Sequence, residues 1–452
     1  MDLDLRDIQS LLAGPARATT VRHLIFGFPR TEAARSFVRG LAPSVTMADT
    51  QAGSSPDASV NVGFTFRGLS TLGVDPALLG KFDAVFKRGP EGAALGDVRG
   101  SRSDPANWWE GQFDTDDAHC MVQVQSRSED ALEAVTVAVR STAGDSGVTE
   151  LIPRRDGTVL EARSLGGGRL HFGYTDGISH PDIRWSDAAG SPGQVDFRTF
   201  VLGYATPAFS SAPRVGPAAE LVRGGTYAAF RWMYQDVAAF TAFLRTQGPR
   251  LYPHLPPADA EERLAAKLMG RWRDGTPLVL SPDRPDPSLS RANDFGYGTQ
   301  DPRGAACPLS AHIRVVNPRD QALDPVVDGV PRVIRRGMPY GPPLVGDEDD
   351  GVDRGVLGLF LCADLRRQFY TLTGWIKRND FSPVYDADRR AQDAVIANRA
   401  IAGASTNLVL PGEGSNGGDV LLEKLPDFVH TKGTAFLLYP GRTMLRALTD
   451  DS

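Results

Sequence analysis

The stretch Cys120-Met-Val-Gln-Val-Gln-Ser-Arg-Ser128 decides the fold class, because a strand pattern passes directly into a helix pattern. Apolar and polar side chains alternate over residues 120–125, which is typical of a strand. Ser128 is suited to cap a helix N-terminus, and residues 128–140 have helical spacing. A further strand is predicted at residues 148–152, so this unit is strand, helix, strand.

The preceding residues repeat this order. Residues 23–28 and 59–66 have strand patterns, and residues 76–87 have a helical pattern. Residues 31–41 are predicted to form a helix, with Thr31 as a possible N-cap. The alternation along these strands is typical of an antiparallel sheet.

A second series of strands and helices occupies the C-terminal half. Strands are predicted at residues 197–202, 226–234, 332–340, 355–361 and 435–439, and helices at residues 236–246, 259–272 and 364–377. We therefore predict an α+β protein of two related units. The first is residues 1–165, the second is residues 197–452, and residues 166–196 join them.

Composition excludes some classes of partner. The 452 residues are 41% hydrophobic and 23% charged, as in an ordinary globular protein. The net charge of −6 gives no electrostatic reason to expect binding to nucleic acid or to a membrane. The three cysteines form no CxxC pair, so neither a disulfide framework nor a zinc site is predicted. The first residues lack a signal-peptide pattern, and we expect a cytoplasmic protein.

His312 is the candidate metal ligand. It follows the long irregular stretch 273–308, and Arg314 and Arg319 come soon after it. A ligating imidazole usually donates its other ring N–H to a carboxylate, which fixes the tautomer. Asp364 is the predicted partner. The alternative for Asp364 is an acid at a helix start, which the helix macrodipole favours.

Asp176 is the candidate acid/base group. It lies between Gly173 and Gly177, and glycines allow a loop to approach a flat ligand closely. A positioned carboxylate can take a proton from one atom of a substrate and return it to another. The alternative is an ordinary turn in which Asp176 caps the backbone.

A fixed cation is expected beside this carboxylate, and Arg335 and Arg336 are the candidates. A guanidinium does not deprotonate, so it can stabilise a developing negative charge. Adjacent strand side chains point to opposite faces, so only one of the two should face the site. Such a cation should lower the pKa of Asp176, so we expect better turnover below neutral pH than above it.

These segments closely resemble those of dye-decolourising peroxidases, which are haem enzymes. The resemblance spans nearly the whole chain, from Asp7-Ile-Gln9 onward. Its motifs are Phe172-Gly-Tyr-Thr-Asp-Gly-Ile178, Asn293-Asp-Phe295, Cys307-Pro308, Ala311-His-Ile-Arg314, Asn317-Pro-Arg319, Arg335-Arg-Gly337, Tyr340-Gly341 and Leu425-Pro-Asp-Phe-Val429.

The resemblance implies one haem b per chain, with His312 as axial ligand to the iron, Asp176 as acid/base residue and Arg335 as its cationic partner. Asp364 falls where the family's acidic partner of the axial histidine would lie. The residues expected to line the haem are Asp176, Gly177, Ile178, Asn317, Pro318, Arg319 and Arg335.

The resemblance also implies two ferredoxin-like domains with antiparallel sheets, the haem being held mainly by the second, and the larger cytoplasmic subgroup. The implied reaction reduces hydrogen peroxide and oxidises dyes, phenols or other aromatic reductants by one-electron steps. A monomer or homodimer is expected, and a packaging partner is left open. Five aromatic residues are candidates for a surface electron relay: Trp108, Trp109, Trp232, Tyr234 and Tyr340.

Two alternatives remain at this point. One is a haem or porphyrin carrier, or a haem-processing protein, with incidental peroxidase activity. A carrier would need neither Asp176 nor Arg335, so the presence of both favours the enzyme. The other is a related haem enzyme that acts on an oxidant such as chlorite, or on haem itself.

Overall fold

The computed structural model describes residues 3–13, 18–49, 57–187, 190–191, 193–205, 213, 216–321, 330–378, 393–414 and 417–449. Its centre is a ten-stranded sheet in which neighbouring strands pair antiparallel, with the main strand order β10-β11-β8-β14-β2-β3-β1-β4. None of the described helices has the length and apolar character needed to cross a membrane.

The N-terminal half forms one ferredoxin-like unit with the strand order β2-β3-β1-β4. Its elements are β1 (Thr20–Gly27), α2 (Thr31–Leu41), β2 (Ala58–Phe64), β3 (Cys120–Ser126), α7 (Glu129–Ser146) and β4 (Thr149–Leu151). The Ser128 hydroxyl accepts the N–H of Ala131 at 3.3 Å, which confirms the predicted cap of α7. Thr31 is instead the first residue of α2, and Arg30 is at the N-cap position without a side-chain cap.

The C-terminal half repeats this order as β10-β11-β8-β14. Its elements are β8 (Thr226–Gln235), α9 (Val237–Leu251), β10 (Met338–Tyr340), β11 (Gly355–Cys362), α12 (Thr371–Arg378) and β14 (Val429–Tyr439). The expected α+β class with two ferredoxin-like units is therefore confirmed.

The two units share one sheet. Strand β14 pairs with β2 at Leu438 and Phe64, and this contact joins the C-terminal unit to the N-terminal one. Strand β5 (Leu160–Arg163) pairs with β1 and also lies close to β10. The domain boundaries at residues 165 and 197 stay a prediction.

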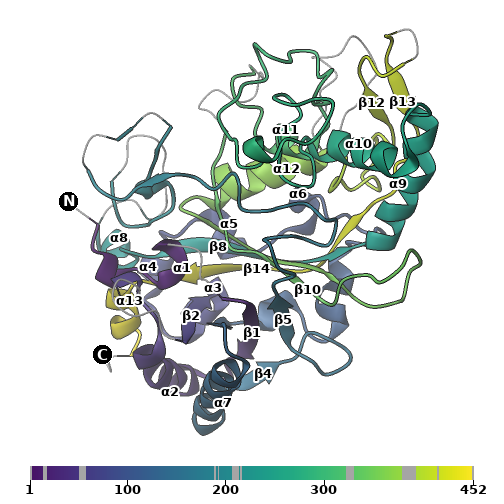
Figure 1. Cartoon of the computed structure of the whole chain (residues 1–452). Coiled ribbons are helices and arrows are strands. Elements are labelled where there is room, and N and C mark those ends of the chain that lie inside the picture. Colours follow the sequence, from purple (N-terminus) through teal and green to yellow (C-terminus); the bar gives the residue numbers. More distant parts are fainter. Residues whose placement is uncertain are drawn as a thin grey trace.

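The remaining elements are short or lie outside the repeats. Helices α10 (Pro257–Met269) and α11 (His312–Val316) lie with α9 and α12 on one side of the sheet, whereas α2 and α7 lie on the other (Figure 1). The others are α1 (Ser10–Ala13), α3 (Phe66–Thr71), α4 (Pro76–Leu79), α5 (Ala84–Arg88), α6 (Gly92–Leu95), β6 (Ile183–Arg184), β7 (Val195–Asp196), α8 (Pro217–Leu221), β9 (Ile334–Arg335), β12 (Leu408–Leu410), β13 (Val420–Leu422) and α13 (Arg442–Ala447).

Candidate functional site

His312 is the first residue of the short helix α11, and its ring is held by a buried carboxylate. Nδ1 of His312 lies 2.7 Å from Oδ2 of Asp393. The other oxygen, Oδ1, accepts the backbone N–H groups of Val395 at 2.8 Å and Ile396 at 2.9 Å. Because Nδ1 is engaged by this carboxylate, Nε2 is the ring nitrogen left for a ligand.

The prediction that Asp364 is the carboxylate partner of His312 was wrong. Its side chain accepts the N–H of Arg367 at 2.8 Å and caps the π-helical turn Leu365–Tyr370 that leads into α12. Burial raises the pKa of Asp364, against the lowering effect of that hydrogen bond. Asp364 therefore stands at a helix start, which was the alternative in the sequence, and Asp393 is the carboxylate on the histidine.

Asp176 lies in a tight loop that the backbone fixes at several points. The N–H of Asp176 donates to the carbonyl of Gly168 at 2.8 Å, and the N–H of Thr175 donates to the carbonyl of Arg273 at 3.1 Å. Gly177 has a φ of +81°, a left-handed conformation that a residue with a Cβ rarely adopts. The glycine after Asp176 is therefore required by the turn.

The carboxylate of Asp176 pairs with the guanidinium of Arg335 at 3.2 Å. Burial raises the pKa of Asp176, but the charge of Arg335 and the N–H of Gly177 lower it. The pKa is therefore lower than the ordinary value, as expected from the sequence.

The side chains of the two adjacent arginines contact different parts of the structure, as strand alternation predicts. Arg335 is on β9, which pairs with β11. Its side chain reaches Asp176, whereas Nε of Arg336 donates to the carbonyl of Leu11 at 2.7 Å. Burial lowers the pKa of Arg336 to about 10. The structure thus identifies Arg335 as the cation that faces the carboxylate.

The segment after α11 is held against the loop at residues 293–295. Asn317 accepts the N–H of Arg319 at 3.2 Å, and Pro318 is buried. The Arg319 guanidinium lies 3.7 Å from the ring centroid of Phe295 and donates to the carbonyl of Asn293 at 2.7 Å. These contacts fix the side chain of Arg319 against the loop at residues 293–295.

The residues after Asp176 pack against neighbouring glycines and His180. A Cβ on Gly275 would lie 2.6 Å from Cδ1 of Ile178, so glycine makes room for Ile178. A Cβ on Gly177 would lie 3.7 Å from Nε2 of His180. Burial and the charges of Arg335 and Arg336 lower the pKa of His180, which is therefore neutral at pH 7.

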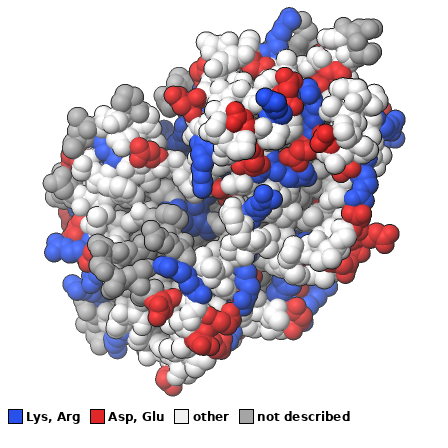
Figure 2. Space-filling view, in the orientation of Figure 1, with Lys and Arg blue, Asp and Glu red and all other residues white. Residues whose placement is uncertain are grey.

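The arrangement suits a flat ligand with a central metal. An imidazole with a free Nε2 can ligate the metal, and a carboxylate with a guanidinium can act on a small molecule bound to it. Among the described residues, no group of the structure bonds to Nε2 of His312. The face in Figure 2 is hollowed near its centre, and Lys and Arg side chains lie around this hollow.

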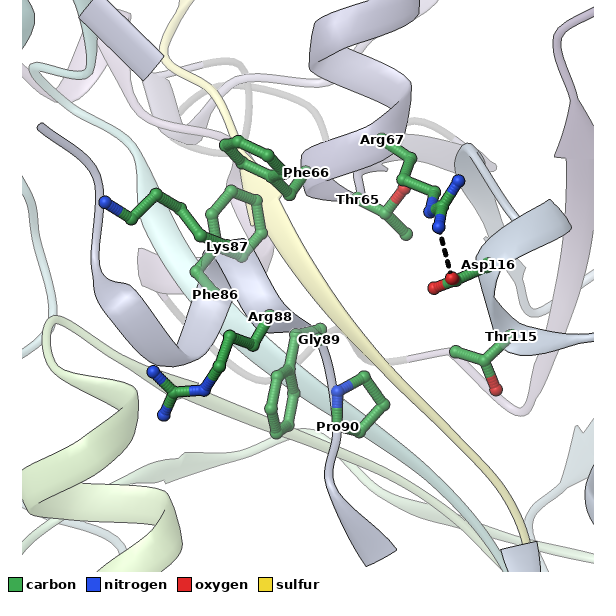
Figure 3. Close-up of a pocket in the computed structure, with 11 residues that line it drawn as sticks. Thr65, Phe66, Arg67, Phe86, Lys87, Arg88, Gly89, Pro90, Thr115 and Asp116 are labelled. Carbon is green, nitrogen blue, oxygen red and sulfur yellow. Dashed lines mark hydrogen bonds and ion pairs between the residues drawn. The ribbon is translucent and has the colours of Figure 1, made fainter. Parts of the chain in front are cut away.

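A separate recess of about 100 Å³ contains none of the predicted site residues. It lies near the junction of β2 and β14, and Phe66 and Phe86 line it with the ion pair of Arg67 and Asp116 (Figure 3). The charged ends of the neighbouring Lys87 and Arg88 point away from this ion pair (Figure 3). Polar groups do not converge there, so the recess is not the candidate site.

Comparisons with known proteins agree with this geometry. A family model described as the DyP dimeric alpha+beta barrel domain matches residues 32–155. A dye-decolorizing peroxidase of Mycena epipterygia is 30% identical over 406 residues, which are 84% of this chain and 73% of the relative. The structure of an ancestral D-type dye decolorizing peroxidase matches with a TM-score of 0.83 at 25% identity, over 100% of both chains. A dye-decolorizing peroxidase in complex with 2,6-dimethoxyphenol matches with a TM-score of 0.78 at 24% identity, over 99% of both chains.

Proposed function

Since this chain belongs to the dye-decolorizing peroxidase family, it is a peroxidase that oxidises aromatic compounds, and we propose that His312, Asp176 and Arg335 form its active site. The observation that carries this proposal is an imidazole held by a buried carboxylate, in a structure that also pairs Asp176 with Arg335. We propose hydrogen peroxide as the oxidant and dyes or phenols as reductants.

Peroxidases of this family are haem enzymes, and we propose one haem b per chain with Nε2 of His312 as the axial ligand. The residues fit this group because Nδ1 is already bonded to Asp393. The haem, when bound, supplies the iron and the redox chemistry. We propose that Gly177, Ile178 and Asn317 line it together with Pro318, Arg319 and Arg335.

The protein residues supply a proton path and a fixed charge. Asp176 is ionised at neutral pH, so it can accept the proton from one oxygen of hydrogen peroxide and return it to the other. The oxygen that leaves gains negative charge as the O–O bond breaks. The guanidinium of Arg335, 3.2 Å from Asp176, stabilises that charge. Asp393 fixes the His312 ring and makes it more electron-rich.

An absorption experiment tests the proposal directly. The haem-loaded chain is mixed with one equivalent of hydrogen peroxide, and the visible spectrum is followed on the millisecond scale. A histidine-bound ferric spectrum that changes within milliseconds supports the peroxidase. Bound haem that does not react favours the carrier, and the absence of a haem band contradicts the role of His312.

Replacing Arg335 by leucine should change the pH dependence of the peroxide reaction. In the native chain the pKa of Asp176 is lowered, so the base stays active until the pH falls below the ordinary carboxyl value of 3.8. Arg335→Leu removes the lowering charge while burial still raises the pKa. The acid limb of the rate profile should therefore move up by about 1–3 pH units. Stopped-flow rates between pH 3 and pH 7 measure this, and an unmoved limb contradicts it.

Burial reduces the number of aromatic residues that could serve as a surface electron relay. Trp108, Trp109, Trp232 and Tyr340 are buried, so they are not surface residues, whereas Tyr234 is half-buried. We expect Tyr234→Phe to slow the oxidation of a bulky dye, because phenylalanine is much harder to oxidise. Oxidation of a small phenol that enters the haem site should keep its rate. Steady-state kinetics with both reductants measure this, and unchanged dye kinetics count against a relay through Tyr234.

We propose a cytoplasmic protein of the larger subgroup, a monomer or homodimer. A packaging partner stays open.

A further inference from the structure

A buried arginine holds the turn that carries Asp393. The side chain of Arg399 is only 6% exposed. Its Nη2 donates to the backbone carbonyls of Asp393 and Ala394, each at 3.2 Å. Its Nη1 donates to the carbonyl of Pro426 at 3.0 Å. One planar guanidinium thus ties the start of the turn to a segment close to β14.

Asp427 fixes this arginine in turn. Its Oδ1 accepts the backbone N–H of Arg399 at 2.9 Å and lies 3.5 Å from Nη1 of Arg399. Asp427 belongs to the motif Leu425-Pro-Asp-Phe-Val429, which is part of the family resemblance and has no role in the site as described so far. Asp427 is connected to His312 through Arg399 and the turn of Asp393.

The same turn is tied to the residues that precede His312. The N–H of Ala394 donates to the carbonyl of Ser310 at 2.8 Å. Asp393 therefore has a bond from its own carboxylate to His312 and a bond from its neighbour to the segment leading into α11. Arg399 holds the opposite side of the turn, so the carboxylate cannot move without breaking one of these contacts.

Arg399 also places a positive charge close to the turn that carries the buried carboxylate of Asp393. The side chain of Asp393 is fully buried, and an ionised carboxylate in that position needs compensation. The guanidinium of Arg399 supplies a positive charge beside it, and Asp427 offsets part of the cost of burying that guanidinium. A buried ion pair is often no more stabilising than apolar packing, so stability alone gives little reason for an arginine here.

We propose that Arg399 is a positioning residue for the axial histidine: it fixes the Asp393 turn so that Oδ2 stays on Nδ1 of His312, and Asp427 fixes Arg399. This inference rests on the proposed haem peroxidase function. In this arrangement Asp393 holds Nδ1 of His312, the ring nitrogen opposite the proposed iron ligand. Arg399 holds the turn of Asp393, and Asp427 holds Arg399.

Arg399→Met tests the proposal, because methionine fills similar space without charge or donors. The matched control is Arg354→Met, since Arg354 is also buried, bonds to the carbonyl of Pro342 at 2.9 Å and pairs with Asp350 at 2.6 Å, away from Asp393. The readouts are the iron–histidine stretching band in the resonance Raman spectrum of the reduced, haem-loaded chain and the rate of haem transfer to apomyoglobin. Thermal unfolding of both variants is measured alongside.

Arg399→Met should shift and broaden the iron–histidine band and speed haem transfer by about tenfold. Arg354→Met should leave the band and the transfer rate unchanged, although it destabilises the fold. Arg399→Lys keeps the charge but not the planar fork, so it should give an intermediate change. Asp427→Asn should do the same and serves if Arg399→Met does not fold. Wild-type bands and transfer rates in every Arg399 and Asp427 variant that folds overturn the proposal.

Failure of the haem proposal is distinguishable from failure of this inference. If the native chain shows no iron–histidine band, the proposed function is wrong. The Nδ1–H proton of His312 is then followed by NMR in the full haem-free chain. Its protection from exchange should still be lost in Arg399→Met and kept in Arg354→Met. Retained protection in Arg399→Met rejects the positioning role.

Discussion

Asp176→Asn should slow the reaction of the haem-loaded chain with hydrogen peroxide by about 10²- to 10⁴-fold, the usual contribution of a positioned acid/base group. Asparagine has nearly the same size and can still bond to Arg335, but it cannot take up a proton at neutral pH. Removing the carboxylate therefore isolates proton transfer from the shape of the site. Stopped-flow absorbance after mixing with peroxide gives the rate.

The haem content of this variant should equal that of the native chain, because His312 and Asp393 are untouched. Asp182→Asn is the matched control, since Asp182 is an exposed aspartate in the same segment, bonded to Gln194 at 3.2 Å. It should react at the native rate. A rate for Asp176→Asn within about threefold of the native value would remove Asp176 from the mechanism.

His312→Ala should lower haem affinity by more than about 100-fold, because loss of an outer partner of a ligand alone costs about 10- to 100-fold. Alanine leaves Asp393 without its partner and the metal without its protein ligand. The fold should persist, since α11 is short and carries little of the core. Titration of the haem-free chain with haem, followed by absorbance, measures the affinity.

Added imidazole provides a second test of the His312→Ala variant. It fits the space left by the side chain, so it should restore a histidine-like spectrum to bound haem. His254→Ala is the control, because His254 is exposed, and it should bind haem as the native chain does. Native affinity in His312→Ala would show that another residue ligates the iron.

Local rules explain why some of this structure could be predicted. Strand β3 and helix α7 follow from period-two alternation and from the Ser128 cap, both of which act within a few residues. The prediction of a single helix at residues 76–87 was wrong. Helix α4 ends at Leu79 with Gly80 at its C-cap, and the Asp83 side chain caps a second helix, α5. Turn chemistry interrupted a pattern that hydrophobic spacing alone made continuous.

The candidate site, too, could be predicted only in part from local sequence. Alternation predicted that one of Arg335 and Arg336 faces the carboxylate, but the choice depends on the pairing of β9 with β11, which is a contact across the sheet. Asp393 is far from His312 in the chain, and no spacing links them. An aspartate that opens the apolar run Ala-Val-Ile-Ala was the only local signal for it. Asp364 had a stronger local signal, and that signal was for a helix cap.

The pairing of β14 with β2 bears on any attempt to make a smaller catalyst. A fragment that begins at Phe197 keeps His312, Arg335 and Asp393, but it loses Asp176 and the strand that covers one edge of β14. Unpaired strand edges recruit other chains and promote aggregation. Miniaturisation would therefore have to redesign the β14 edge with charged residues or a bulge before the chemistry is considered.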